Sequence, residues 1–318
     1  MKKTKCCAEQ PKKRTSIGGQ ALIEGIMMMG PDRIATVVKK LDGSHVVKEE
    51  EYVPLSKRLF LARVPFLRGI FAFGSSLSNG TRQLMWSADQ VEFEETEPSK
   101  FDQWIERKFG MKKAEKVLTS IAMVLGVLMP IGLFILLPTL LASFVPFPED
   151  LWWLRSLCEG GLRLLIFIGF LFATSLMKDM RRTYSYHGAE HKSIHCYESG
   201  EELTVENVRR HTRRHPRCGT SFLFVVMIIS ILTFSFIHIE NTWLRLVLRL
   251  VLLPVVVNLS YEANRLVGRY DNWFTKMLRA PGVALQGLTT REPDDEMIEV
   301  AIDALTRVIP KESDADKW

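Results

Sequence analysis

Histidines and a glutamate are concentrated in one short stretch of this chain. His187, His191 and His195 are three of the seven histidines, and Glu190 precedes the middle one. Residues four apart lie on one face of a helix, about one turn from each other. His187 and His191 could therefore bind the same metal ion. His-x-x-Glu-His is also the inverted zincin pattern, in which the glutamate acts as the general base, so we predict Glu190 to be catalytic.

A second cluster, His215-Pro-Arg-Cys-Gly-Thr-Ser221, brings an imidazole and a thiol close together. Both are borderline-to-soft ligands that suit zinc. We predict a metal site formed by His187, His191, His215 and Cys218. His195 is left out because it would lie about 12 Å from His187 along a helix axis, too far for one ion.

Other readings of these residues stay open. Glu262 is an alternative source of a remaining ligand, and Lys192 and Arg217 could steady an anionic substrate. The histidines could also be solvated residues beside a membrane. Cys218 could be a small core residue. Glu198 is read as a charge at a helix end.

Long apolar runs separate the charged parts of the chain. They cover residues 118–145, 160–177, 222–239 and 243–260. A helix needs roughly 20 apolar residues to cross a membrane, which the third run only just approaches. We therefore predict a mainly α polytopic membrane protein with four transmembrane helices, a small N-terminal β-hairpin and cytoplasmic helical segments. Arg245 and Arg249 are expected to extend to the lipid headgroups, or to pair with Glu240.

Basic residues indicate the orientation. The net charge is +6, and lysines and arginines gather before the first run, between the second and third, and after the fourth. The positive-inside rule then places both termini and the histidine stretch in the cytoplasm. No interleaved aromatic and basic surface indicates a nucleic-acid partner. Residues 1–14 are polar and basic with no apolar stretch behind them, so we expect no cleavable signal peptide.

The soluble segments divide the chain into three predicted regions. Residues 1–116 form an N-terminal cytoplasmic region. Within it, 15–31 is expected to be a glycine-rich loop, 34–53 a hairpin turning at Asp42-Gly43, and 64–77 an interfacial segment too broken to span as a helix. Residues 117–260 form the membrane domain with a cytoplasmic His/Cys loop at 178–221. Residues 261–318 form a cytoplasmic helical tail.

Two helix ends are predicted in detail. The second span should continue as a helix through His187 and His191 and stop at Gly200. In the tail, a helix should begin near Pro293 and bury one apolar face. That face consists of Met297, Ile298, Val300, Ala301, Ala304 and Leu305.

Three motifs resemble the YqhQ-like family of bacterial membrane proteins, which are described as predicted metal-dependent enzymes of unknown function. The motifs are Gly18–Pro31, Tyr186–Lys192 with Tyr197-Glu198, and His215–Ser221. The resemblance extends to Thr289–Pro293 and covers nearly the whole chain. It implies a bacterial inner or plasma membrane and singles out His187, Glu190, His191, His215 and Cys218.

Two functions are consistent with these residues. The first is a zinc-dependent hydrolase acting at the cytoplasmic membrane face on a membrane-protein or lipid-linked substrate. The second is a non-catalytic membrane assembly or partner-binding factor with a structural metal site. A transporter is less favoured, because the spans lack paired acidic residues at mid-depth.

Overall fold

The computed structural model describes residues 14–91, 104, 107–108, 110–148, 151–237, 239, 241–312 and 315–316. The chain divides into two compact units. The first, here called the sheet unit, comprises residues 1–92, 171–229 and 254–318. The second, the bundle unit, comprises residues 93–170 and 230–253.

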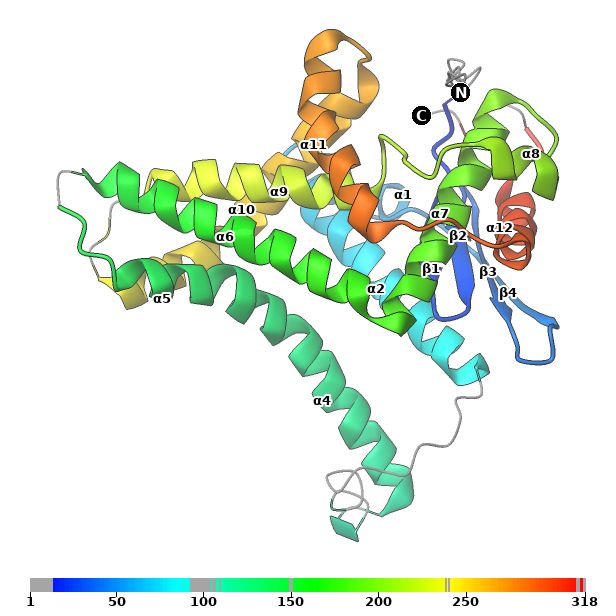
Figure 1. Ribbon diagram of the computed structural model, residues 1–318, viewed down its shortest axis with the longest axis horizontal. Coiled ribbons are helices and arrows are strands. Elements are labelled where there is room, and N and C mark those ends of the chain that lie inside the picture. The colour runs from blue at the N-terminus through cyan, green and yellow to red at the C-terminus, as the bar shows by residue number, and fades with distance from the viewer. Residues whose placement is uncertain are drawn as a thin grey trace, which may run out of the picture. The chain divides into compact units, whose positions relative to one another are not determined.

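Four antiparallel strands form one sheet in the order β1-β2-β3-β4 (Figure 1). They are β1 (Gly18–Leu22), β2 (Gly25–Met29), β3 (Arg33–Lys39) and β4 (His45–Glu51). The predicted hairpin is confirmed as β3 and β4, and Gly43 in its turn has φ of +83°. Glycine is favoured in that left-handed conformation.

The glycine-rich loop predicted for 15–31 is wrong, because this segment forms β1 and β2. Gly19, Gly25 and Gly30 in this segment serve close packing. A Cβ on Gly19 would lie 2.8 Å from the carbonyl oxygen of Met27, and one on Gly25 would lie 2.4 Å from that of Val37. Glycine in a strand often marks such a close approach of backbone.

The irregular structure predicted for 64–77 is also wrong, whereas the interfacial position of this segment stays a prediction. Short turns, α1 (Leu55–Arg58) and η1 (Phe60–Arg63), lead into α2 (Arg68–Gln90), a regular helix of 23 residues. Gly69 and Gly80 do not break α2. They lie where a side chain would collide with Asn258 or Gln20.

The core of the sheet unit lies between the sheet and two helices, α7 (Lys178–Ser199) and α12 (Asp295–Val308). Helix α7 packs on β1 and β2, and α12 packs on β2, β3 and α7. Figure 1 shows both helices beside the sheet, with the short α8 (Val205–Arg210). The buried apolar residues here are Ile17, Ile26, Met28, Ala35, Val37, Tyr186, Ala189, Ile194, Cys196, Val208, Met297, Ile298, Val300, Ala301, Ala304, Leu305 and Val308.

Flanking residues explain where α7 ends and where α12 begins. Gly200 stops α7 with φ of +70°, as predicted. Asp294 caps α12 by accepting a hydrogen bond from the backbone N–H of Met297 at 2.9 Å. The six apolar residues predicted to face inward from this helix are all buried.

Helix α7 is not a continuation of the preceding span, contrary to prediction. That span, α6 (Trp152–Leu176), ends before Met177, which is extended at φ −70°, ψ 135°. Side chains take up the carbonyl freed by the break. Nη2 of Arg291 and Nε of Arg181 donate to the oxygen of Ser175 at 2.9 and 3.2 Å.

Among the described residues, three helical stretches are long and apolar enough to cross a membrane: Ser120–Ser143, Trp152–Leu176 and Thr242–Arg269. The first joins α4 (Met111–Ile131), a π turn (Gly132–Leu136) and α5 (Leu137–Ser143). The last is α10. Helix α9 (Gly219–Ser235), predicted at 222–239 as the third of four spans, has only 17 residues. At 1.5 Å per residue it extends about 25 Å, short of a 30 Å hydrocarbon core. Helix α11 (Trp273–Thr289) follows α10.

We predict that Gly188→Ala destabilises the protein by about 1–3 kcal/mol, the usual cost of overpacking. A Cβ on this residue of α7 would lie 2.0 Å from the carbonyl oxygen of Arg291. Gly74→Ala in α2 is the matched control, because its Cβ would meet nothing within 4 Å. Thermal unfolding in detergent should show a midpoint below that of the wild type for Gly188→Ala. The midpoint of Gly74→Ala should not fall below that of the wild type. Equal midpoints would contradict this packing.

Candidate metal centre

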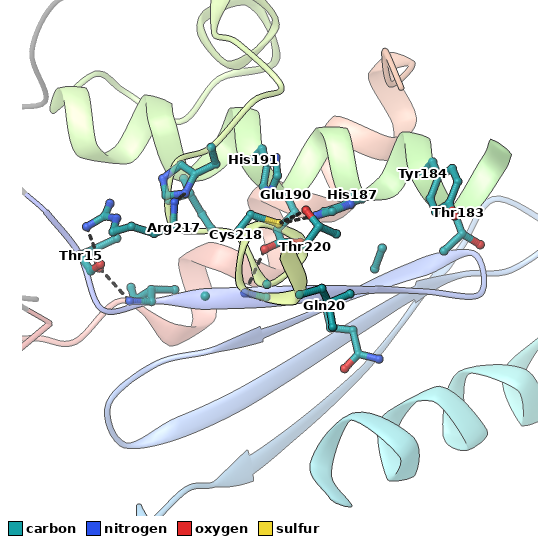
Figure 2. Close-up of a pocket in the computed structure, with 18 of the residues that line it drawn as sticks. Thr15, Gln20, Thr183, Tyr184, His187, Glu190, His191, Arg217, Cys218 and Thr220 are labelled. Carbon is teal, nitrogen blue, oxygen red and sulfur yellow. Dashed lines mark hydrogen bonds between the residues drawn. The ribbon is translucent and has the colours of Figure 1, made fainter. Parts of the chain in front are cut away.

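Two histidines of α7 lie side by side in the sheet unit. The ring centroids of His187 and His191 are 4.4 Å apart, with an angle of 62° between the planes. This is the arrangement that a four-residue helical spacing predicts. Figure 2 shows both rings, with Glu190, projecting from α7 toward Cys218 and Thr220.

Backbone carbonyls fix the tautomer of both rings. Nδ1 of His187 lies 2.9 Å from the oxygen of Thr289, and Nδ1 of His191 lies 2.6 Å from that of Arg213. A carbonyl oxygen only accepts, so each Nδ1 carries the proton and each Nε2 keeps its lone pair. Metal-binding histidines are commonly held in this way by their second nitrogen.

The thiol of Cys218 meets these two Nε2 atoms. Its Sγ is 3.1 Å from Nε2 of His187 and 3.3 Å from Oγ1 of Thr220. Nε2 of His191 is buried and makes no hydrogen bond of good geometry to any described residue. Ligand atoms of His187, His191 and Cys218 all lie within 4.8 Å of one another, so the three residues could hold a metal ion.

Burial and neighbours favour the ligating forms of these groups. Burial lowers the pKa of His191 to about 4, so its imidazole is neutral at pH 7. Burial alone would raise the pKa of the Cys218 thiol. The contacts with His191 and Thr220 outweigh that effect and bring the pKa below its ordinary value. A thiolate is the form that binds metals.

Glu190 lies beside the trio and is tied to the sheet. One carboxylate oxygen accepts a hydrogen bond from the backbone N–H of Gly19 at 3.1 Å. Burial raises the pKa of Glu190 to about 7. A carboxyl group with such a pKa can both take up and release a proton near neutral pH.

A cleft of about 380 Å³ opens beside these groups. One wall is the edge strand β1 with the residues before it, and the other is α7 with the start of α9 (Figure 2). His187, Glu190, His191 and Cys218 all line it. A small molecule or an extended chain could therefore reach the trio.

The structure groups His215, the fourth predicted ligand, with other residues. Its ring centroid lies 4.6 Å from that of His195 and 5.6 Å from that of His191. Its Nε2 is 3.6 Å from a carboxylate oxygen of Glu198. His195, Glu198 and His215 form a second group that could hold a metal. Gln286 anchors its backbone, accepting from the N–H at 2.8 Å and donating to the carbonyl at 2.7 Å.

Three other residues differ from expectation. Arg217 is not free to bind an anion, because it forms an ion pair with the buried Glu198. Lys192 is buried, donates to the carbonyl of Arg209 at 2.9 Å and pairs with Glu292. Glu262 pairs with Arg68 and is not among the residues that line the cleft.

Glu198, predicted to be a charge at a helix end, is the next-to-last residue of α7, but its side chain is buried and paired. Its side chain is 2% exposed and accepts the backbone N–H of Thr15 at 2.8 Å as well as Arg217. Burial alone would raise the pKa of Glu198, but His215, Arg217 and the N–H of Thr15 outweigh that effect and lower the pKa to about 2. Because the carboxylate is already paired with a guanidinium, the second group is less suited to a cation than the first.

Sequence reasoning missed the contributors that act through their backbone. These are the carbonyls of Arg213 and Thr289 and the N–H of Gly19. A side-chain motif carries no signal for such groups, because any residue type supplies them. A third group that could hold a metal, Cys196, Glu201 and His211, lies at the end of α7 and was also not predicted.

Comparison with known proteins identifies the family. Residues 64–311 match the family described as "Protein of unknown function (DUF1385)". The chain is 33% identical over 297 residues to the "Uncharacterized protein YqhQ" of Bacillus subtilis (strain 168), covering 93% of each chain. No solved structure matches the chain. This protein therefore belongs to the YqhQ-like family of proteins that contain the DUF1385 region.

Proposed function

We propose that this protein is an integral membrane metallohydrolase that holds zinc on His187, His191 and Cys218. The observation that carries the proposal is the pair of carbonyl-anchored imidazoles, whose Nε2 atoms are left facing one thiol. Two nitrogens and a sulfur suit zinc better than magnesium or calcium, which prefer oxygen ligands. Three protein ligands beside a cleft leave the fourth position for water or substrate, as in catalytic zinc sites.

Glu190 is proposed as the general base. Zinc in such a site supplies Lewis acidity toward a water molecule and a substrate carbonyl or phosphoryl oxygen. The raised pKa of Glu190 lets it take a proton from water and return it to the leaving group. The N–H of Gly19 holds the carboxylate in place during both transfers.

The proposed setting is the cytoplasmic face of a bacterial inner or plasma membrane. Three apolar helices suggest membrane association. The positive-inside distribution supports a multi-pass topology with both termini and the cleft in the cytoplasm. Both termini share one side only when the number of crossings is even, so we propose that the short α9 crosses as well, which local thinning of the bilayer allows. A site on such a frame would act on membrane-protein or lipid-linked substrates, and we propose no nucleic-acid partner.

An alternative is a non-catalytic assembly or partner-binding factor with a structural metal. The origin of the ligands and of the carbonyls that hold them supports this alternative. These groups come from three separate parts of the chain: α7, the segment 213–218 and the end of α11. An ion held there would tie these segments together, as structural zinc does in small domains.

The first prediction from the proposed function concerns metal content. Purified wild-type protein should contain one zinc per chain, and His191→Ala or Cys218→Ala should lose most of it because each removes a ligand. His195→Gln is the matched control on the same helix and should keep the metal. Elemental analysis measures this. A metal-free wild type, or equal loss in the control, would count against the trio.

The second prediction separates catalysis from structure. Glu190→Gln should retain zinc but behave like His191→Ala in cells, because it keeps the ligands and removes the base. The wild-type chain is replaced in cells by each variant, and the readout is the set of membrane proteins and lipids that accumulate compared with the wild-type strain. If Glu190→Gln matches wild type while His191→Ala does not, the metal is structural.

The third prediction concerns topology. A cysteine placed at the exposed Pro148, before α6, should react with an impermeant maleimide on intact cells. A cysteine placed at the exposed Glu202, after α7, should react only after permeabilisation. Wild-type protein gives the background labelling. The reverse order of labelling would overturn the proposed orientation.

A further inference from the structure

The bundle unit contains a buried cluster of charged side chains, separate from the metal centre. Glu159 of α6 is surrounded by arginines from α6 and α10. Glu159, Arg163, Arg245 and Arg249 are 2%, 3%, 4% and 2% exposed. Glu159 forms an ion pair with Arg249, and its Oε1 lies 3.8 Å from Arg155 and 3.9 Å from Arg245. The expectation that Arg245 and Arg249 reach the headgroups is therefore wrong, and Glu240 lies outside the described residues.

The remaining contacts of these arginines within the described part of the chain are with neutral groups. Arg163 donates to the carbonyl of Phe134 at 2.8 Å and to Oγ of Ser230 at 3.3 Å. Arg245 donates to the carbonyl of Ile239 at 3.4 Å and to Oγ1 of Thr242 at 3.3 Å, and Arg249 donates to Thr139. The guanidinium carbons of Arg163 and Arg249 lie 5.1 and 5.5 Å from the ring centroid of Phe234. These groups orient the arginines but supply no negative charge.

Positive charge is therefore in excess. Among the described residues the cluster sets four guanidinium groups against one carboxylate. An uncompensated charge in an apolar interior costs several kcal/mol, so the described part of the cluster favours binding of a further negative charge. The Nε atoms of Arg155, Arg245 and Arg249 are also buried with no acceptor among the described residues.

The position of the cluster suggests how a counter-ion could enter. Glu159 is seven residues from the start of α6 and Arg249 seven from that of α10, about 10 Å along each axis. Trp152 and Trp153, exposed at the start of α6, are typical of a membrane interface. Arg155 lies between them and Glu159, and its side chain is 25% exposed. The cluster is thus one to two turns below the level expected for headgroups.

We propose that this arginine cluster binds a phosphate-bearing anion. Phosphate carries the one or two negative charges that the cluster lacks, and guanidinium groups bind it through paired N–H donors. The source is either the headgroup of an anionic lipid or free phosphate. Both present the same group to Arg155, Arg245 and Arg249. This site is independent of the proposed hydrolase activity.

The test measures thermal unfolding of the full chain in a neutral detergent with three additions. They are inorganic phosphate, phosphatidylglycerol, and diacylglycerol as a lipid without phosphate. Wild-type protein should be stabilised by one of the first two and not by the third. Stabilisation by phosphatidylglycerol alone identifies a lipid ligand, and stabilisation by inorganic phosphate identifies a free anion. No shift with either would overturn the proposal.

Variants of the cluster sharpen the test. Arg155→Gln should weaken the apparent affinity on the order of tenfold, since it removes one nearby positive charge. Glu159→Gln should strengthen it, because it removes the competing carboxylate. Arg265→Gln, an exposed arginine on the same α10, is the control and should leave the affinity unchanged. An affinity unaltered by Arg155→Gln, or weakened by Glu159→Gln in folded protein, would show that the arginines serve only Glu159 and the neutral acceptors.

Discussion

The candidate metal centre depends on two hydrogen bonds from imidazole N–H groups to backbone carbonyls. A helix places His187 and His191 on one face, but it does not decide which ring nitrogen faces the cleft. The oxygens of Thr289 and Arg213 make that decision, from positions 102 and 22 residues away in the chain. The ligand set therefore exists only when α7, the segment before α9 and the end of α11 are all folded. Because both acceptors are main-chain atoms, substitution at Thr289 or Arg213 would not by itself remove them.

The sheet contributes to the same centre through close packing. Gly19 brings the backbone of β1 near enough to donate to Glu190, and Gly188 lets α7 approach the carbonyl of Arg291. A side chain at either glycine would move these segments apart. The catalytic role proposed for Glu190 thus rests on an edge strand rather than on its own helix. Burial between strand and helix is also what raises its pKa to about 7.

Local patterns in the sequence predicted much of this arrangement. The four-residue spacing of His187 and His191, the stop at Gly200 and the apolar face of α12 depend on helix geometry alone, and the structure agrees with all three. Interactions between distant segments could not be predicted. The glycine content of residues 15–31 indicates a loop, whereas Gly19 lies in β1 because the backbone of β2 approaches it closely. Glu198 and Arg217 were read separately, because nothing in one sequence shows that they form an ion pair.

Two buried carboxylates show how the surroundings decide whether a charge is balanced. The carboxylate of Glu198 pairs with the guanidinium of Arg217 and accepts the backbone N–H of Thr15. Burial lowers the pKa of the neighbouring His215 to about 4, so this imidazole adds no positive charge at neutral pH. The charge of Glu198 is therefore balanced by Arg217. Glu159 has four arginines around it, three of them almost fully buried. One carboxylate is too little for that number of guanidinium groups in an apolar bundle. The first arrangement is balanced within the chain, whereas the described residues leave the second with the excess positive charge that the proposed anion would neutralise.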